Sequence, residues 1–176
     1  MRNDSIHLSE YDERWPIAYE EARARLAEAL HPYALDIQHV GSTSVPGLAA
    51  KPIIDIALAI EEYPLPAAAI LEVVALGYEF LGEHGIPRRH YFRKGRPRTH
   101  HVHVVEGDSQ EWEHFILFRD YLRTHPQAAR RYEALKRELA ARYQDDRAAY
   151  TDSKAPFIKE LMEEGRAWRQ TAVEHS

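Results

Sequence analysis

The sequence predicts an α/β (α+β) fold in which a small mixed β-sheet packs with helices and a helical C-terminal half follows. Three observations carry this prediction. An apolar run at residues 53–60 is typical of a strand buried on both faces. Short segments rich in aromatic and β-branched residues accompany it, separated by turns that contain Gly or Pro. From Glu111 onward, apolar residues recur at the three- and four-residue steps of amphipathic helices.

The first elements are a helix, two strands and a second helix. Asp12 is a suitable N-cap for a helix over 13–30, whose apolar side chains share one face. Pro64 and Pro66 open the second helix, and Gly77 ends it in the C′ position. Between the two helices the pattern predicts a strand at 34–40, a turn-rich loop at 41–48 and the buried strand at 53–60.

The remaining strands are short, and the remaining helices are amphipathic. Strands are expected at 78–81, 90–94 and 99–105, and the last two form a hairpin through residues 95–97. Apolar stripes then follow within 112–122, 132–143 and 157–168, which predict three or four helices.

Length and composition favour one domain. The chain has 176 residues, of which 44% are hydrophobic and 29% charged, so it can bury a core without disulfide or metal support. It contains no Cys, which excludes disulfides, cysteine–zinc sites and thiol nucleophiles. We expect a single domain over 1–176, with the sheet within about 1–110 and the helical part within about 111–176. A polar start and the lack of any apolar run near 20 residues predict a cytoplasmic protein with no membrane contact.

The charge distribution limits the partners. The formal net charge of −5 argues against duplex DNA as the main partner, although RNA remains possible. Residues 88–98 nevertheless hold six basic side chains and no acid, with Arg93 among them. Two interpretations stay open: an anionic ligand docks on this run, or the run is a solvated hairpin whose cations face water.

The most informative stretch joins a Gly-Ser turn to an acid within an apolar strand. Gly41 permits a ligand to approach the backbone, and Ser42 offers a hydroxyl and an amide to a phosphate. Burying the carboxylate of Asp55 is costly unless that group is paired or ligates a cation. These residues are therefore the first candidates for a site.

A strand, a Gly-Ser turn and an acidic strand resemble the signature of the nucleotidyltransferase fold of DNA polymerase β type. That resemblance implies carboxylates that hold two divalent ions, Mg or Mn, for in-line phosphoryl transfer. Asp55 would be the first or the second acid of an Asp-x-Asp pair, so the partner position is Ala57 or Ile53. Neither is an acid, and the second carboxylate of such a site is missing.

Almost the whole chain resembles the GrpB family, glutamate-rich protein B, which belongs with the nucleotidyltransferase fold. The specific blocks are GSTSVPGLAAKPIIDI at 41–56 and FRDYLR at 118–123, with further matches at 11–15, 101–104, 132–136, 150–154 and 157–158. The resemblance implies a small mixed sheet of nucleotidyltransferase type. The family has no established biochemical role, and some members are fused to dephospho-coenzyme A kinase.

Two histidines could complete a site around Asp55. His101 and His103 leave the same face of a strand because they are two residues apart. Imidazole is a common ligand for divalent metals, so the hypothesis is that Asp55, His101 and His103 form a metal or proton-transfer site, with Asp55 and His103 as catalytic residues. The alternative is that both rings are packed, hydrogen-bonded residues of a half-buried strand.

The candidate nucleotide- or phosphate-binding residues lie on the loop and on the helical half. Lys51 precedes Pro52 and is held extended near the loop, unless it is only an exposed lysine. Arg119 could instead belong to a structural ion pair that ties its helix to the sheet. For three residues of the helical half, Lys136, Tyr150 and Lys154, only the resemblance suggests a role. The full set of candidates is Gly41, Ser42, Thr43, Ser44, Lys51, Arg93, Arg119, Lys136, Tyr150 and Lys154.

Three functions follow from these expectations. The first is a metal-dependent transferase that moves a nucleotidyl or phosphoryl group from a nucleotide to a small molecule or an RNA. The second is a non-catalytic module that binds a nucleotide or another phosphorylated metabolite. The third is a partner protein of a metabolic enzyme, such as a kinase of coenzyme A biosynthesis.

Overall fold

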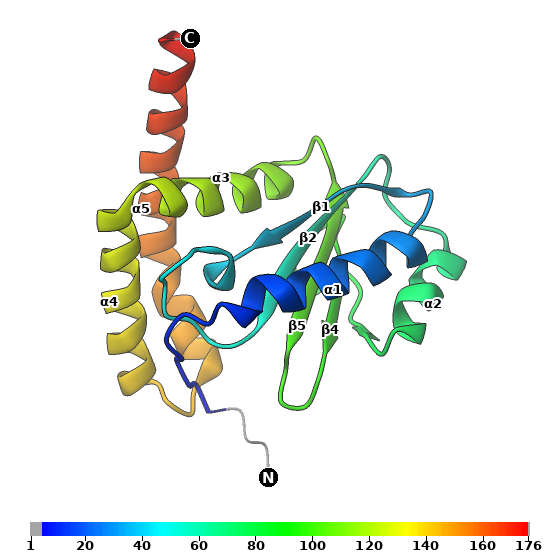
Figure 1. Ribbon diagram of the computed structural model, residues 1–176, viewed down its shortest axis with the longest axis horizontal. Helices are drawn as coiled ribbons and strands as arrows, with labels where there is room; N and C mark the ends of the chain where they lie inside the picture. Colours follow the sequence, from blue (N-terminus) through cyan, green and yellow to red (C-terminus); the bar gives the residue numbers. More distant parts are fainter. Residues whose placement is uncertain (1–4, 176) are drawn as a thin grey trace.

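The computed structural model describes residues 5–175, which form a five-stranded mixed sheet with helices on both of its faces (Figure 1). In chain order the elements are α1 (Arg14–Ala29), β1 (Ala34–Val40), the short 3₁₀ helix η1 (Ser42–Ser44), β2 (Ile54–Ile60), α2 (Ala67–Ala75), β3 (Glu79–Phe80), β4 (His90–Lys94), β5 (His100–Glu106), α3 (Gln110–Thr124), α4 (Pro126–Arg142) and α5 (Arg147–Glu174). The predicted fold class is confirmed.

The sheet has the strand order β1-β2-β5-β4-β3, which places β2 and β5 side by side in the middle. β2 is antiparallel to β1 and parallel to β5, while β4 and β5 form the predicted antiparallel hairpin. The register pairs Asp55 of β2 with His101 of β5, and Ala57 with His103. Residues 46 positions apart in the sequence are therefore neighbours on one face of the sheet.

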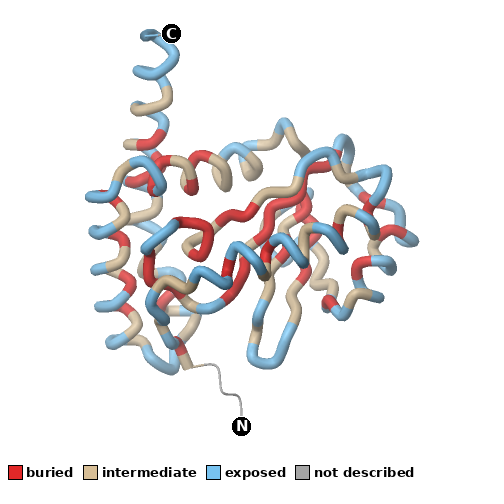
Figure 2. The backbone as a smooth tube through the Cα atoms, in the orientation of Figure 1, coloured by how far each residue is buried: buried red, intermediate tan, exposed pale blue. Residues whose placement is uncertain are grey.

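The two faces of the sheet differ in chemistry. Alternate residues of β2 (Ile54, Ile56, Leu58 and Ile60) belong to the main core with buried residues of α1 and α2. Asp55 and Ala57 consequently face the opposite side, where α3 packs across β1, β2 and β5. α1 crosses the first face in Figure 1, and Figure 2 shows the buried residues concentrated along the central strands.

The helical half forms a second core that includes the loop after β1. Val45 and Leu48 of that loop pack with buried residues of α3, α4 and α5, including Tyr121, Tyr132 and Leu161. The loop is therefore fixed by helices that begin more than 60 residues later in the chain. The last turns of α5 extend beyond this core (Figure 1).

Local differences from the sequence predictions have local causes. The regular turns of α1 begin at Arg14, but Asp12 caps the first turn as predicted, since its carboxylate accepts from the Arg14 amide and its carbonyl accepts from the Trp15 amide. The strand predicted at 78–81 is reduced to β3. The backbone carbonyl of Tyr91 accepts from the Leu81 amide, but the backbone amide of Tyr91 donates to the Gly82 carbonyl. Two residues of one strand therefore face one residue of the other, and this bulge interrupts the hydrogen-bond ladder. After residue 110 the described chain has three helices.

Within residues 5–175, no helix is both long and apolar enough to cross a membrane.

Candidate functional site

Gly41 lies against the carboxylate of Asp55. Its φ of +71° is one that glycine adopts readily, and a Cβ at this position would lie 2.6 Å from Oδ2 of Asp55. The sequence suggested that the space at Gly41 serves a ligand. In the structure the neighbouring acid fills that space, which explains why a glycine stands there.

Three helical side chains fix the loop that follows β1. Arg123 of α3 donates to the Ser44 carbonyl at 2.9 Å. On α4, Glu133 accepts from the Ala49 amide at 3.0 Å, and Lys136 donates to the Ala49 carbonyl at 2.6 Å. These bonds satisfy buried backbone groups that the turn leaves without partners. The position of the loop therefore depends on the packing of α3 and α4.

Buried His39 supports the same loop from β1. Its Nε2 lies 2.9 Å from the Thr43 hydroxyl, and its ring stacks on Tyr19 with centroids 4.8 Å apart. Burial lowers the pKa of His39 to about 4, so the ring is neutral near pH 7.

Asp55 is held by both predicted histidines. Its Oδ1 lies 3.3 Å from Nδ1 of His101 and 3.5 Å from Nε2 of His103. Burial alone would raise the pKa of Asp55, but the hydrogen bonds from the two rings outweigh it and hold that pKa well below its usual range. Burial also lowers the pKa of His103. Because Arg89 donates to Nδ1 of His103 at 3.2 Å, the ring proton sits on Nε2 and is donated to Asp55.

A cavity of about 280 Å³ opens beside Asp55, and we call it the lysine cavity. Three lysines from three different segments line it, together with one carboxylate. Its wall consists of Gly41, Ser42, Thr43, Ala50, Lys51, Ile53, Asp55, His101, Phe118, Tyr132, Lys136, Tyr150, Thr151 and Lys154. Positive charge therefore exceeds negative charge in a half-open, partly desolvated space.

The pKa values of all three lysines are lower than that of a lysine in water. Burial lowers the pKa of Lys51 to about 8, and repulsion from Lys154 and Arg147 adds to the effect. Burial lowers the pKa of Lys154 to about 8 and that of Lys136 to about 7. An anion inside the cavity would oppose each of these shifts.

Tyr150 stands between two of the lysines. Nζ of Lys51 lies 5.3 Å from the centroid of its ring, and Nζ of Lys154 lies 4.5 Å from it. The ring is buried, and among residues 5–175 its hydroxyl has no hydrogen-bond partner. A buried hydroxyl without a partner is costly, so the structure leaves an unsatisfied polar group next to the cavity.

The comparisons with known proteins agree with this architecture. The family model described as GrpB protein matches residues 5–164. The chain belongs to the GrpB family. It is 40% identical to the UPF0157 protein YqkA of Bacillus subtilis over 94% of its own length, but it spans only 48% of that relative. A crystal structure of the conserved protein GrpB from Enterococcus faecalis matches with a TM-score of 0.87 and 40% identity, covering 92% of this chain and 99% of that one.

More distant likenesses place the GrpB-family chain among nucleotidyltransferase folds. A crystal structure of the Cid1 poly(U) polymerase with Mg 3′-dATP bound matches with a TM-score of 0.55 and 14% identity, covering 82% of this chain and 48% of Cid1. At this identity the likeness shows the fold alone. A dephospho-CoA kinase of Mycolicibacterium paratuberculosis is 30% identical over 93% of this chain, which spans 46% of that kinase.

Nine of the predicted site residues line the lysine cavity of this GrpB-family chain. They are Gly41, Ser42, Thr43, Lys51, Asp55, His101, Lys136, Tyr150 and Lys154. Sequence reasoning assigned no site role to Phe118 and Tyr132, which also line the cavity. Both residues have the helical spacing of apolar side chains that pack on a core. That spacing gives no indication that a residue also borders a cavity.

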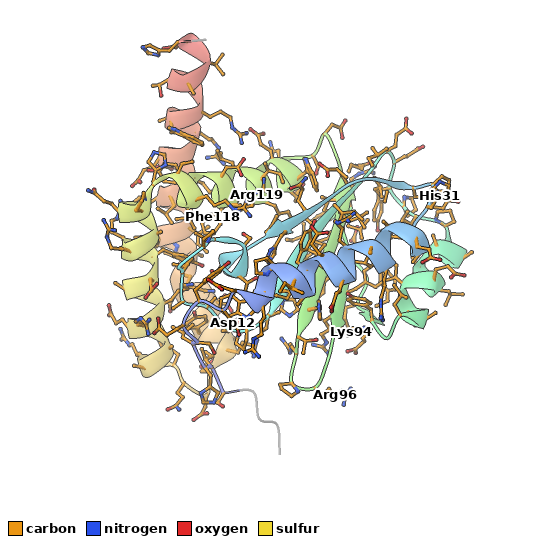
Figure 3. All side chains as sticks on the ribbon, viewed as in Figure 1. Asp12, His31, Lys94, Arg96, Phe118 and Arg119 are labelled. Atoms are coloured by element: carbon orange, nitrogen blue, oxygen red, sulfur yellow. The ribbon has the colours of Figure 1, made fainter. Side chains whose placement is uncertain are left out.

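The other predicted residues lie outside the cavity wall. The Ser44 hydroxyl donates to the Gly41 carbonyl, and Arg93 pairs with Glu79 at 2.8 Å. Arg119 ties α3 to β1 by a hydrogen bond to Oε1 of Gln38 at 2.7 Å, whereas its ion pair is with the adjacent Asp120 of α3 at 2.9 Å and not with the sheet. Figure 3 shows Arg119 and Phe118 on α3, well separated from Lys94 and Arg96 of the basic hairpin.

The residues around Asp55 fit a two-ion centre poorly. Asp55 is the one carboxylate of the cavity wall, and the partner positions hold buried Ile53 and Ala57. Within residues 5–175, no three His, Cys, Asp or Glu side chains are arranged to hold a metal ion. Both histidine rings approach the same oxygen, Oδ1, and the nearby lysines repel cations. The metal site at Asp55, His101 and His103 stays a prediction.

Replacing Lys154 with Met should stabilise the protein without ligand near pH 7. We expect an effect on the order of 1 kcal/mol, or about 2–4 °C in Tm for a chain of this size. The reason is that burial and the repulsion from Arg147 both penalise the charged form of Lys154. Thermal unfolding of Lys154→Met beside Lys159→Met, an exposed lysine on the same helix, measures the difference.

The buried charge of Lys154 should also affect how the stability of the protein changes with pH. In the unfolded chain Lys154 keeps its proton up to a pKa near 10.5, whereas in the folded protein it loses the proton near pH 8. Since the unfolded state binds more protons between these values, stability rises as the pH increases through this window. Lys154→Met should flatten the rise, and a pH profile parallel to that of the unaltered protein would contradict the buried charge.

Proposed function

We propose that this GrpB-family chain binds the phosphate groups of a nucleotide, or of another phosphorylated small molecule, in the lysine cavity. One observation carries the proposal: three lysines with lowered pKa values and a single carboxylate line the same half-open cavity. Folded proteins rarely gather desolvated ammonium groups without a compensating anion. A ligand with several negative charges would supply that compensation.

The contacts favour phosphate over a simple carboxylate. The ammonium groups of Lys51 and Lys154 both lie over the ring of Tyr150. The hydroxyl of Tyr150 has no hydrogen-bond partner among the described residues. Nζ of Lys136 lies 3.0 Å from Oγ of Ser42 and completes the donors on the loop side. The donors surround the cavity, which suits the many acceptor oxygens of a polyphosphate.

The cavity size indicates which part of the ligand is enclosed. Pockets that bury a drug-sized molecule usually occupy roughly 300–1,000 Å³. At about 280 Å³, the lysine cavity suits a polyphosphate group better than a whole nucleotide. The base and sugar of a nucleotide would extend toward solvent, so we expect weak discrimination among the four common bases.

Nucleotidyl or phosphoryl transfer to a small molecule or an RNA is the second candidate function. The position of Asp55 beside the Gly41–Ser42 turn favours it, as does the fold shared with the Cid1 poly(U) polymerase. Transfer by the two-ion route requires several carboxylates, and the cavity wall supplies one. We therefore rank binding ahead of transfer.

Calorimetric titration tests the binding proposal. The probes are sodium tripolyphosphate, ATP, GTP, CTP and UTP, each alone and with Mg²⁺ or Mn²⁺. We expect metal-free tripolyphosphate to bind, Lys154→Met to weaken it by about tenfold or more, and the exposed Lys159→Met to leave it unchanged. Binding that Lys154→Met leaves intact would disprove the site.

Asp55→Asn separates the two functions within the same experiment. If phosphate binds without metal, removing the negative charge of Asp55 reduces repulsion and tightens binding of tripolyphosphate severalfold. If a divalent ion links Asp55 to the phosphates, the same substitution abolishes a metal-dependent signal. No binding by any probe, with both variants folded, would instead favour a partner protein of a metabolic enzyme such as dephospho-CoA kinase.

A further inference from the structure

A second cavity, of about 570 Å³, lies on the other side of His103, and we call it the arginine cavity. It is bordered by Ile86 and Arg89 of the loop before β4, by His103 of β5, and by residues of α3 and α5. His103 separates the two cavities, since its Nε2 faces Asp55 and its Nδ1 faces Arg89. The phosphate-binding proposal makes no use of this space.

Arg89 is a buried cation whose charge is only partly balanced by Glu111, another residue of the cavity wall. Its exposed fraction is 6%, and within residues 5–175 no carboxylate lies at ion-pair distance from its guanidinium. Nε and Nη2 donate to the carbonyls of Glu83 and His84, and Nη1 donates to His103. A guanidinium has five N–H bonds, so these four contacts leave one N–H of Nη1 for a further acceptor.

The desolvated charge distinguishes Arg89 from an ordinary structural arginine. Backbone carbonyls solvate a guanidinium, but they do not neutralise it, and burial lowers the pKa of Arg89. An anionic group on Nη1 would provide both the missing acceptor and the rest of the charge balance.

The cavity wall is mixed, with four apolar residues (Ile86, Phe115, Leu117 and Met162) among seven polar or charged ones. Buried Leu117 and Met162, together with the half-buried ring of Phe115, belong to its apolar part. Exposed Arg166 adds a second positive charge and Glu111 a negative one, while Glu113 is paired with Arg169 at 3.5 Å. An occupant therefore meets a cation at one end and an apolar surface along its body.

We propose that the arginine cavity binds a small molecule that joins one anionic group to an apolar body. The anionic group would accept a hydrogen bond from the remaining N–H of Arg89, and the apolar part would pack on Phe115 and Met162. A fully polar ligand would leave these apolar walls uncompensated, and a neutral apolar one would leave the cation only partly compensated.

The fluorophore 8-anilinonaphthalene-1-sulfonate is a suitable probe, because it combines a sulfonate with aromatic rings. We expect one molecule to bind per chain with an increase in fluorescence, and decanoate to displace it. Met162→Trp fills the wall and should weaken binding by about tenfold or more, whereas the volume-conserving Met162→Leu should leave it unchanged. Arg89→Gln should weaken it similarly, and near-UV circular dichroism verifies that each variant is folded.

The outcomes also separate this inference from the phosphate site. Lys154→Met and saturating tripolyphosphate should leave the fluorescence unchanged, because both act in the lysine cavity. If the probe fails to bind, is displaced by tripolyphosphate or binds Met162→Trp and Met162→Leu equally well, the arginine cavity is not its site and the inference is wrong. Failure of tripolyphosphate to bind while the fluorophore binds as described would overturn only the proposed function.

Discussion

Gly41→Ala is expected to destabilise the fold by about 3 kcal/mol, against about 1 kcal/mol for Gly47→Ala in the same loop. Both glycines have a positive φ, +71° and +83°, so both substitutions carry the strain of a left-handed backbone. They differ in what a new Cβ meets. At Gly41 it would lie 2.6 Å from Oδ2 and 3.0 Å from Cβ of Asp55, whereas at Gly47 nothing lies within 4 Å.

Urea unfolding of the two variants measures this difference. Gly41→Ala must displace the carboxylate from His101 and His103, and its excess cost over Gly47→Ala reports that displacement. In the double variant Gly41→Ala, Asp55→Ala, part of the clash is gone. The loss of stability in the double variant should therefore be smaller than the sum of the losses in the two single variants. Equal costs at both glycines would show that Asp55 is not held where the structure places it.

Binding of tripolyphosphate at pH 8 is expected to take up about two protons, while binding at pH 6 takes up almost none. At pH 8 a lysine with a pKa of about 7 is mostly neutral, and two with pKa values of about 8 are half neutral. An anion raises all three pKa values, so the neutral amines gain protons as the ligand binds. Below pH 7 the lysines are already charged, and little is left to take up.

Calorimetry in buffers of different ionisation enthalpy counts these protons. Lys154→Met should reduce the uptake at pH 8 by about half a proton, even though it also weakens binding. Lys159→Met, on the exposed side of α5, serves as the matched control and should leave the count unchanged. Proton uptake that is absent at pH 8, or equal at pH 6 and 8, would show that the three lysines do not contact the ligand.

Local sequence patterns were sufficient to predict most of the fold. Burial repeats every second residue on a strand and every three or four on a helix, so the apolar run at 53–60 and the stripes after Glu111 each identify their element. Turn chemistry predicted the β4–β5 hairpin in the same way. The prediction that failed, the length of β3, concerns the end of an element, which depends on single hydrogen bonds.

Only part of the candidate site could be predicted from the sequence. The Gly41–Ser42 turn and Asp55 lie in one continuous block and could be found from that block and its family resemblance. Tertiary packing alone brings Lys136 and Lys154 to the same cavity, because their helices are placed by a core that includes Val45 and Leu48. It also decides that Arg119 ties α3 to β1 and that His103 stands between two cavities. A periodic pattern specifies which face of an element is buried, but the convergence of side chains depends on how distant elements pack.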